Sequence, residues 1–314
     1  MTLPAQEGVS IIVPAYNYAE FIEQALESAL AQTYPNIEIV VVDDGSTDQT
    51  PVILRRYADR IRTVTQDNLG LAAARNTGLR EASHGLVAFL DADDILLPGM
   101  VSLLHGTLAL VGGECALVAA NHSYIDASGR PLDKYPRGPQ ETVEVTRKDL
   151  LLRNRFATCG VLARRDALVA LGGFNEELAR VEDRDLWLRL VERRQILQVP
   201  DVLCQVRLHF RNMSKDAELM ASCLHDMLTA AFQRRPADPT WERRCWGAYH
   251  HECAWMYHDA EDRWRAVASE LRSLTTFPAP SLRADLAAPP CFRIRSLLRF
   301  LLGLRATPAP LPDE

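Results

Sequence analysis

Two β-branched apolar runs flank a stretch of helical periodicity, and this arrangement constrains the fold more than any other feature of the sequence. The runs are residues 9–14 (VSIIVP) and 37–42 (IEIVVV). Between them, residues 18–32 carry apolar or small side chains at the i, i+3 and i+4 spacing of an amphipathic helix. Strands that are apolar throughout must be covered on both faces. The pattern therefore predicts an α/β fold with an open, mostly parallel sheet and helices on both faces.

The alternation of strand and helix patterns continues to about residue 206, and three helix patterns and a basic tail follow. Further strands are predicted at residues 61–65, 85–90, 116–121 and 196–206, and further helices at 50–58, 70–81, 99–111, 146–154, 165–171, 183–193, 216–233, 239–258 and 262–274. A loop or small hairpin is predicted for residues 125–142. The division predicts one domain over residues 1–214, a helical accessory region over 215–277, and a Pro-containing linker with a basic amphipathic tail over 278–314.

Charge and composition exclude several classes of protein. Among 314 residues, 35 Lys and Arg stand against 41 Asp and Glu, so the formal charge of −6 gives no support for nucleic-acid binding. Seven cysteines, an odd number with no Cys-x-x-Cys, argue against a secreted disulfide framework. No leader-like segment and no run of about 18 apolar residues is present. We therefore expect a cytoplasmic protein.

Polar motifs follow three of the predicted strands. They are PAYN (14–17), DDGS (43–46) and DADD (91–94). Ligands of open α/β sheets bind outside the carboxyl ends of the strands. Carboxylates gathered there repel one another unless a cation lies among them, and Mg²⁺ or Mn²⁺ prefers carboxylates completed by a phosphate. Although DDGS alone also favours a plain turn, the three motifs together predict a site for a divalent cation and a diphosphate.

Two weaker signals lie downstream. The pair Glu182-Asp183 precedes a predicted helix, where a carboxylate can also serve only as a cap. Arg207 and His209 follow the last strand-like segment, and a lone His is more often structural than a ligand. Each signal is unspecific alone, and their order along the chain carries the information.

In that order, the motifs resemble the family 2 glycosyltransferases of the GT-A fold. The matching segments are IIVPAYN (11–17), VVDDGSTD (41–48), QDNLGLAAARNTG (66–78), FLDADD (89–94), GGFNE (172–176), VEDRDLW (181–187) and VRLHFRNMS (206–214). Ordered matches across the first 214 residues are specific, although Asp-x-Asp by itself is not. The resemblance implies that the sheet is of the GT-A type.

The resemblance also implies a reaction and its catalytic groups. A sugar would move from a nucleoside-diphosphate donor, with a UDP-sugar favoured, to a hydroxyl of a glycan, a lipid-linked oligosaccharide or another cell-surface acceptor, with inversion. Asp183 would be the general base, and the like charge of Glu182 beside it would favour proton uptake. Asp93 and His209 would hold Mn²⁺ or Mg²⁺. Arg75 and Arg207 would lie near the diphosphate and offset its growing negative charge.

The remaining positions would bind the nucleotide. Tyr16 would stack on the base, and Asp44 would accept a ring N–H from uracil, thymine or guanine. By resemblance, the nucleotide-binding residues are Pro14, Tyr16, Asp44, Asn68, Arg75 and Asp91, with Asp91 at the ribose or the metal shell. Asp43 is expected to cap its turn, and Gly172 and Gly173 to serve the backbone.

Two other functions are weighed against this one. A sugar nucleotidyltransferase would need a Gly-rich, basic loop after the first strand, and residues 14–17 contain neither Gly nor a cation. A non-catalytic nucleotide-sugar-binding or scaffold protein would be indicated by the loss of Asp93 or Asp183, and both are present.

The basic tail over residues 292–305 interleaves Arg with Leu and Phe. Such a helix either lies on an anionic membrane or docks on the protein's own body. A peripheral position on the inner face of the cell membrane is therefore the second expectation for location.

Overall fold

The computed structural model describes residues 7–132, 138–209, 216–278 and 292–304. Two compact units divide the chain: Met1–Leu150 with Asn154–His209, and Leu151–Arg153 with Phe210–Glu314. Each unit is described by itself.

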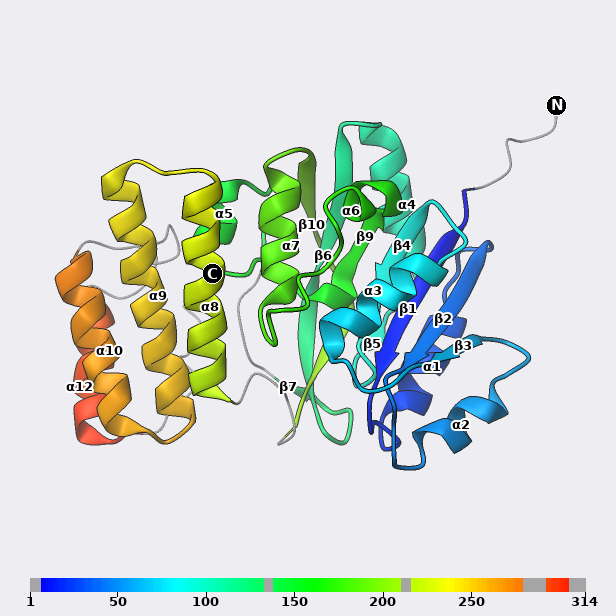
Figure 1. Ribbon diagram of the computed structural model, residues 1–314, viewed down its shortest axis with the longest axis horizontal. Coiled ribbons are helices and arrows are strands. Elements are labelled where there is room, and N and C mark those ends of the chain that lie inside the picture. The colour runs from blue at the N-terminus through cyan, green and yellow to red at the C-terminus, as the bar shows by residue number, and fades with distance from the viewer. Residues whose placement is uncertain (1–6, 133–137, 210–215, 279–291, 305–314) are drawn as a thin grey trace. The chain divides into compact units, whose positions relative to one another are not determined.

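The first unit contains a mixed sheet with the order β3-β2-β1-β4-β9-β6-β10-β5, in which β7 pairs with β6 and β8 with β10 (Figure 1). The strands are β1 (Val9–Ala15), β2 (Ile37–Asp43), β3 (Arg62–Thr65), β4 (Leu86–Phe89), β5 (Ile95–Leu96), β6 (Cys115–Asp126), β7 (Pro131–Leu132), β8 (Val143–Glu144), β9 (Val161–Arg164) and β10 (Gln195–Leu208). The longest ladders, β1 with β2 and β6 with β10, are parallel. The predicted α/β class with a mostly parallel sheet is confirmed.

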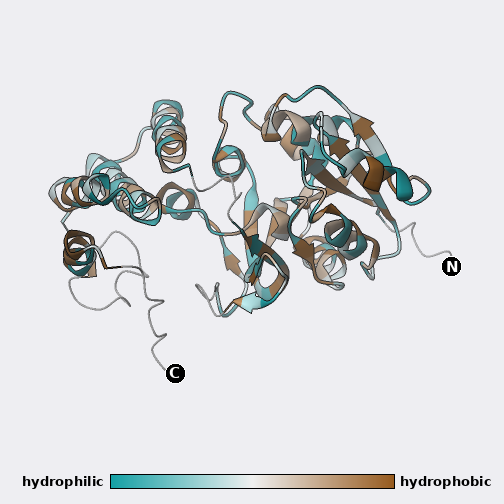
Figure 2. Ribbon diagram, turned by 90° about the horizontal axis from the view of Figure 1, so that it is seen from below, coloured by the Kyte–Doolittle hydropathy of each residue, from teal (hydrophilic) through white to brown (hydrophobic). Residues whose placement is uncertain are grey.

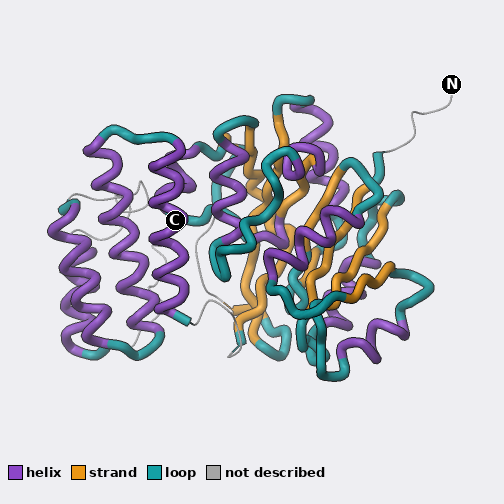
Figure 3. Tube along the Cα trace, in the orientation of Figure 1, coloured by secondary structure: helices purple, strands orange, loops and turns teal. Residues whose placement is uncertain are grey.

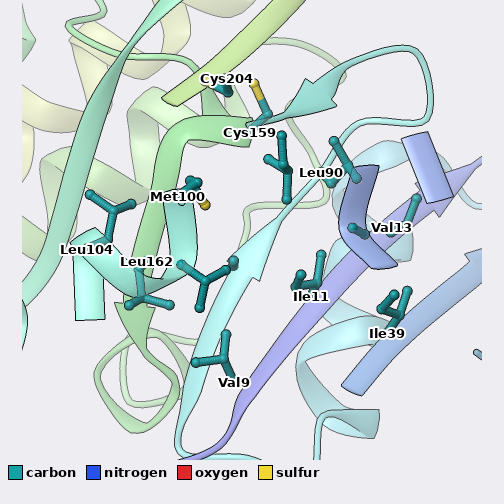
Figure 4. Packing of buried hydrophobic residues seen from close by; sticks show 14 of the residues in the cluster. Val9, Ile11, Val13, Ile39, Leu90, Met100, Leu104, Cys159, Leu162 and Cys204 are labelled. Atoms are coloured by element: carbon teal, nitrogen blue, oxygen red, sulfur yellow. The ribbon is translucent and has the colours of Figure 1, made fainter. Parts of the chain in front are cut away.

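Helices cover both faces of this sheet. They are α1 (Ile22–Leu30), α2 (Thr50–Arg56), α3 (Leu71–Glu81), α4 (Met100–Val111), α5 (Arg147–Leu152), α6 (Arg165–Val169) and α7 (Glu182–Val191). Ile11 and Val13 of β1 share a core cluster with α1 and α4, whereas Ile12 faces Gly78 of α3. Since successive strand side chains point to opposite faces, α1 and α4 lie on one face and α3 on the other. Figure 4 shows the first face, where Val9 and Ile11 belong to one cluster with Met100 and Leu104.

The sequence patterns missed some of the strands. β9 is antiparallel to both of its neighbours, β4 and β6, and it is only four residues long, too short to give a period. β6 extends to Asp126, beyond the predicted end at residue 121, and pairs with β7. The hairpin option for residues 125–142 is thus the observed one, and residues 133–137 lie outside the described part of the chain.

The second unit is helical over its described residues (Figure 3). Its helices are α8 (Ala217–Arg234), α9 (Pro239–Asp259), α10 (Arg263–Thr276) and α12 (Phe292–Leu302). Asp216, Asp238 and Asp262 cap the first three by accepting hydrogen bonds from backbone N–H groups of the first turn. Ala254, Ala266, Val267 and Phe300 form a small core. None of the helices in the described ranges is long and apolar enough to cross a bilayer. Most of the predicted linker, residues 279–291, lies outside those ranges.

The close approach of α3 to β1 gives a first prediction. A Cβ on Gly78 would lie 2.2 Å from Cγ2 of Ile12, a fully buried side chain, so one of the two would have to shift. Gly78→Ala should therefore lower the free energy of unfolding by about 2 kcal/mol. Gly106→Ala is the control, since it is also helical and a Cβ there meets nothing within 4 Å. It should raise the same free energy by about 0.5 kcal/mol. Equal effects in chemical denaturation would contradict the packing argument.

Candidate active site

The polar motifs meet where the parallel strands β1, β2 and β4 end. In the register of the sheet, Ala15 at the end of β1 lies opposite Asp43 at the end of β2. Asp43 accepts a hydrogen bond of 3.0 Å from the Ser46 N–H, the turn-capping role expected for it. Tyr16 follows β1 directly, and 41% of its surface is exposed, so its ring is accessible to a ligand. Pro14 is buried and Asn68 is exposed.

Asp44 is buried and holds the turn that leads into α3. Its carboxylate accepts hydrogen bonds from Gln66 Nε2 at 2.7 Å, from the Leu69 N–H at 3.0 Å and from the Gly70 N–H at 2.9 Å. Thr77 holds Gln66 in turn, donating to its Oε1 at 2.6 Å. A carboxylate offers about four acceptor positions, so these contacts use most of them. A ring N–H of a nucleobase bound to Asp44 would compete with the N–H groups of Leu69 and Gly70, or would take the remaining acceptor position.

Arg75 is buried on α3 and joins two carboxylates from distant segments. Its Nη2 lies 2.6 Å from Asp91 Oδ1, and its Nη1 lies 2.5 Å from Glu182 Oε1. Its Nε is buried and has no hydrogen-bond partner. Burial acts to lower the pKa of Arg75, but the charges of Asp91, Glu182 and Asp183 raise it above its ordinary value. In this structure the guanidinium is committed to protein carboxylates, and its contact with a diphosphate stays a prediction.

Arg207 is also fully buried, and it holds the loop that carries the Asp-rich motif. Its Nε donates to the Asp93 carbonyl at 2.7 Å, and its backbone N–H donates to Asp94 Oδ1 at 2.9 Å. Nη2 donates to Gln24 Oε1 at 2.8 Å, and the guanidinium lies 5.0 Å from the ring centre of Phe21. The structure therefore places Arg207 against the loop of residues 91–94, whereas the sequence suggested a place at the diphosphate. That second contact also remains a prediction.

Asp93 and His209 come together although they are far apart in sequence. His209 Nε2 lies 2.9 Å from Asp93 Oδ2, and both side chains are buried. Phe21 stacks on the imidazole, with ring centres 4.8 Å apart. Burial and the nearby charge of Asp91 raise the pKa of Asp93, so this position favours a cation.

The donor set at Asp93 and His209 fits Mn²⁺ or Mg²⁺. One carboxylate oxygen and one imidazole nitrogen are provided, and a diphosphate and water would complete the shell. No group of three or more His, Cys, Asp or Glu is arranged as a metal site within the described ranges. A cation here would therefore need ligands from its substrate, as such ions commonly do.

Asp183 lies in the first turn of α7 and is partly exposed. Its Oδ2 accepts hydrogen bonds from Asn154 Nδ2 at 2.9 Å and from Thr158 Oγ1 at 3.0 Å. Its Oδ1 accepts from the Arg184 N–H at 2.6 Å. These three donors fix the carboxylate and use three of its roughly four acceptor positions. The remaining position suits an acceptor hydroxyl that gives up a proton.

Glu182 pairs with the buried Arg75, and its expected influence on Asp183 stays a prediction. Its side chain is directed to Arg75 and is 7% exposed. Burial raises the pKa of Glu182 to about 7; Arg75 opposes the rise and Asp183 adds to it. The residue before it, Val181, has φ of 57°, a left-handed conformation that is unfavourable for a β-branched side chain. Backbone strain is thus stored at the start of the helix that carries Asp183.

Sequence reasoning missed the residues that orient the candidate base. Asn154 and Thr158 lie 29 and 25 positions before Asp183, in a segment without a motif. It did assign Gly173 to the backbone, and a Cβ there would lie 2.3 Å from Asn76 Oδ1. Asn76 Oδ1 also accepts from the Phe174 N–H at 2.8 Å, which ties the GGFNE segment to α3.

Comparison with known proteins agrees with this fold and site. The sequence model of glycosyl transferase family 2 matches residues 10–167, about half of the chain. The chain belongs to glycosyl transferase family 2.

Relatives and solved structures give further similarities. An uncharacterized glycosyltransferase of Rickettsia felis is 31% identical over 233 residues, which cover 70% of this chain and 38% of that protein's length. A crystal structure of S. aureus TarS superposes with a TM-score of 0.60 at 20% identity, covering 86% of this chain and 81% of TarS. The Pyrobaculum calidifontis mannosyltransferase PcManGT superposes with 0.61 at 22% identity, covering 96% of this chain and 86% of PcManGT. These similarities confirm the GT-A-type fold.

Glu182 gives a prediction about pH. Its folded pKa of about 7 lies above the ordinary value of 4.5, so between these values the folded chain binds more protons than the unfolded chain. Stability is therefore lost as the pH rises from 4.5 through 7. Glu182→Gln removes this dependence. The wild-type free energy of unfolding, minus that of E182Q, should fall by about 3 kcal/mol over this range.

The measurement is chemical denaturation of both proteins at a series of pH values. Glu27→Gln is the control, since Glu27 is half exposed and forms a surface ion pair with Arg60. The E182Q difference should change with pH more than the E27Q difference does. A flat E182Q difference would mean that Glu182 is ionised throughout and paired with Arg75.

Proposed function

We propose that the protein is an inverting glycosyltransferase that moves a sugar from a nucleoside-diphosphate donor to an acceptor hydroxyl. One observation carries the proposal: the buried Arg75 guanidinium contacts Asp91, two residues before Asp93, and Glu182, one residue before Asp183. A single cation thus joins the segment suited to a donor diphosphate with the segment suited to a general base.

The donor would bind at the ends of β1 and β2. Tyr16 would stack on the base, Asp44 would accept a ring N–H, and Pro14, Asn68 and Asp91 would complete the nucleotide contacts. TarS has been solved with UDP-GlcNAc and PcManGT with GDP-mannose and Mn²⁺, which supports a nucleotide-sugar donor. A UDP-sugar is the favoured donor in this proposal.

Asp93 and His209 would hold Mn²⁺ or Mg²⁺. When bound, the cation offsets the negative charge that grows on the departing diphosphate. Arg207 would keep the Asp93 backbone in place, because its Nε donates a hydrogen bond to the Asp93 carbonyl.

The chemistry at the acceptor falls to Asp183. As the acceptor oxygen bonds to the anomeric carbon, its proton passes to the Asp183 carboxylate and the bond to the diphosphate oxygen breaks. Attack from the face opposite the leaving group inverts the anomeric carbon. Asn154 and Thr158 would keep the base oriented during this step.

The acceptor in this proposal is a glycan, a lipid-linked oligosaccharide or another cell-surface acceptor. A cytoplasmic location, with peripheral attachment to the inner face of the cell membrane, belongs to the same proposal. Donor sugar and linkage would be set by residues around the acceptor side of the site.

The donor site is tested by calorimetric titration of UDP, dTDP and GDP, with Mn²⁺ or with a chelator. We expect one nucleotide to bind tightly and to lose affinity on chelation. Asp93→Ala should weaken the Mn²⁺-dependent binding by at least about tenfold. Asp201→Ala, an exposed carboxylate of β10, is the control and should bind as the wild type does. Metal dependence that is unchanged in D93A would remove Asp93 as a ligand.

The base is tested by Asp183→Asn in a transfer assay with the donor found above. Asn keeps the shape of the side chain but cannot take up the proton, so transfer should fall by about 10²–10⁴-fold. Nucleotide affinity should be unchanged. Asp201→Asn should retain both activities, and a D183N protein that still transfers sugar would exclude Asp183 from the role.

A further inference from the structure

α12 presents an apolar face to solvent. The exposed fractions are 49% for Ile294, 53% for Leu298, 37% for Leu301, 68% for Leu302 and 53% for Leu304 just after the helix. The opposite face holds the buried Ser296 and Phe300, and Phe300 belongs to the small core of this unit. α12 is therefore anchored by one face, while Ile294, Leu298 and Leu302 on its other face are exposed. Figure 2 colours the hydrophobic residues of this helix brown.

The first turn of α10 extends this surface. Arg263 donates a hydrogen bond to the Leu301 carbonyl, which joins the start of α10 to the end of α12. The next residue, Trp264, is 70% exposed, and the Arg263 guanidinium lies 5.4 Å from its ring centre. We call the set the α10–α12 ridge, and its members are Trp264, Ile294, Leu298, Leu301, Leu302 and Leu304.

The charged side chains of α12, which lie beside the apolar residues of the ridge, are all basic. Residues 292–304 contain three Arg and no Asp or Glu, in a chain whose formal charge is −6. Arg293 is buried, but Arg295 is exposed and Arg299 partly so, and Arg263 adds an exposed cation from α10. On the α10 side, Glu261 and Asp262 precede Arg263, and Asp262 lies 3.5 Å from Arg265. The Arg side chains of α12, together with its exposed apolar side chains, complement a negatively charged surface.

We propose that the α10–α12 ridge docks on an anionic lipid surface. The Leu, Ile and Trp side chains enter the interfacial layer, and Arg263, Arg295 and Arg299 remain at the level of the headgroups. α12 has 11 residues and is about 16 Å long, so it lies in the plane of the membrane and does not cross it. A second copy of the same face would bring Arg against Arg, which disfavours the ridge as a symmetric dimer interface. This inference deepens the peripheral attachment that is part of the proposed function, and it needs no step of the sugar-transfer reaction.

The test is flotation of the full-length protein with vesicles. One set contains phosphatidylcholine alone, and the other contains about 30% phosphatidylglycerol, an anionic lipid. We expect partitioning to be about tenfold stronger on the anionic vesicles, and weaker in about 0.5 M salt because the Arg charges are screened.

Two variants separate the apolar and the basic contributions. Leu298→Glu with Leu302→Glu should reduce partitioning at least about tenfold, since two inserting side chains become charged. Arg295→Gln should reduce the preference for anionic vesicles. Leu110→Glu is the matched control. Leu110 is 89% exposed on α4, a helix of the first unit, and its substitution should leave partitioning unchanged.

Two results would overturn the proposal. The first is a wild type that floats with neither vesicle set. The second is a double Glu variant that floats as well as the wild type. If the wild type instead self-associates and the double variant does not, the ridge is an interface between copies. Nucleotide titration of the same variants distinguishes this failure from a failure of the proposed reaction, since it should give wild-type affinity.

Discussion

The contact between Arg75 and its two carboxylates is the interaction on which the site depends. A buried guanidinium is tolerated only when it is paired, and removing one partner leaves an uncompensated charge in the interior. Arg75 meets Asp91 from the end of β4 and Glu182 from the start of α7. Because α3 is pressed onto β1 at Gly78, three residues from Arg75, the packing of the sheet fixes where this cation lies.

Arg207 holds the loop of residues 91–94 from inside the protein, as Arg75 holds Asp91 and Glu182. Its Nε donates to the Asp93 carbonyl, and its backbone N–H donates to the Asp94 carboxylate. Burial and the neighbouring charges of Asp93 and Asp91 raise the pKa of Asp94 well above its ordinary value. Both guanidiniums face inward, so the acidic groups are positioned by protein contacts alone. Such preorganisation is what electrostatic catalysis requires.

The parts of the fold that sequence predicted are those with a period. Residues 9–14 and 37–42 are nearly continuous apolar runs, and such runs form strands that are covered on both faces. β9 could not be predicted, because four residues between two turns carry no period. Within the site, the motifs gave the residue types, but the direction of Arg75 depends on contacts 16 and 107 positions away, which no local pattern contains. Asn154 and Thr158 were missed for the same reason.

The contacts of Asp44 connect the proposed nucleotide site with α3. Its carboxylate accepts the N–H groups of Leu69 and Gly70, which lead into α3, and Arg75 lies further along the same helix. A ligand that draws Asp44 away from these donors would loosen the turn before the helix, and a ligand that leaves them in place would keep that turn fixed. In the proposed enzyme the nucleotide end and the acceptor end would then be coupled through one helix, and by reciprocity each occupant would change the affinity for the other by the same factor.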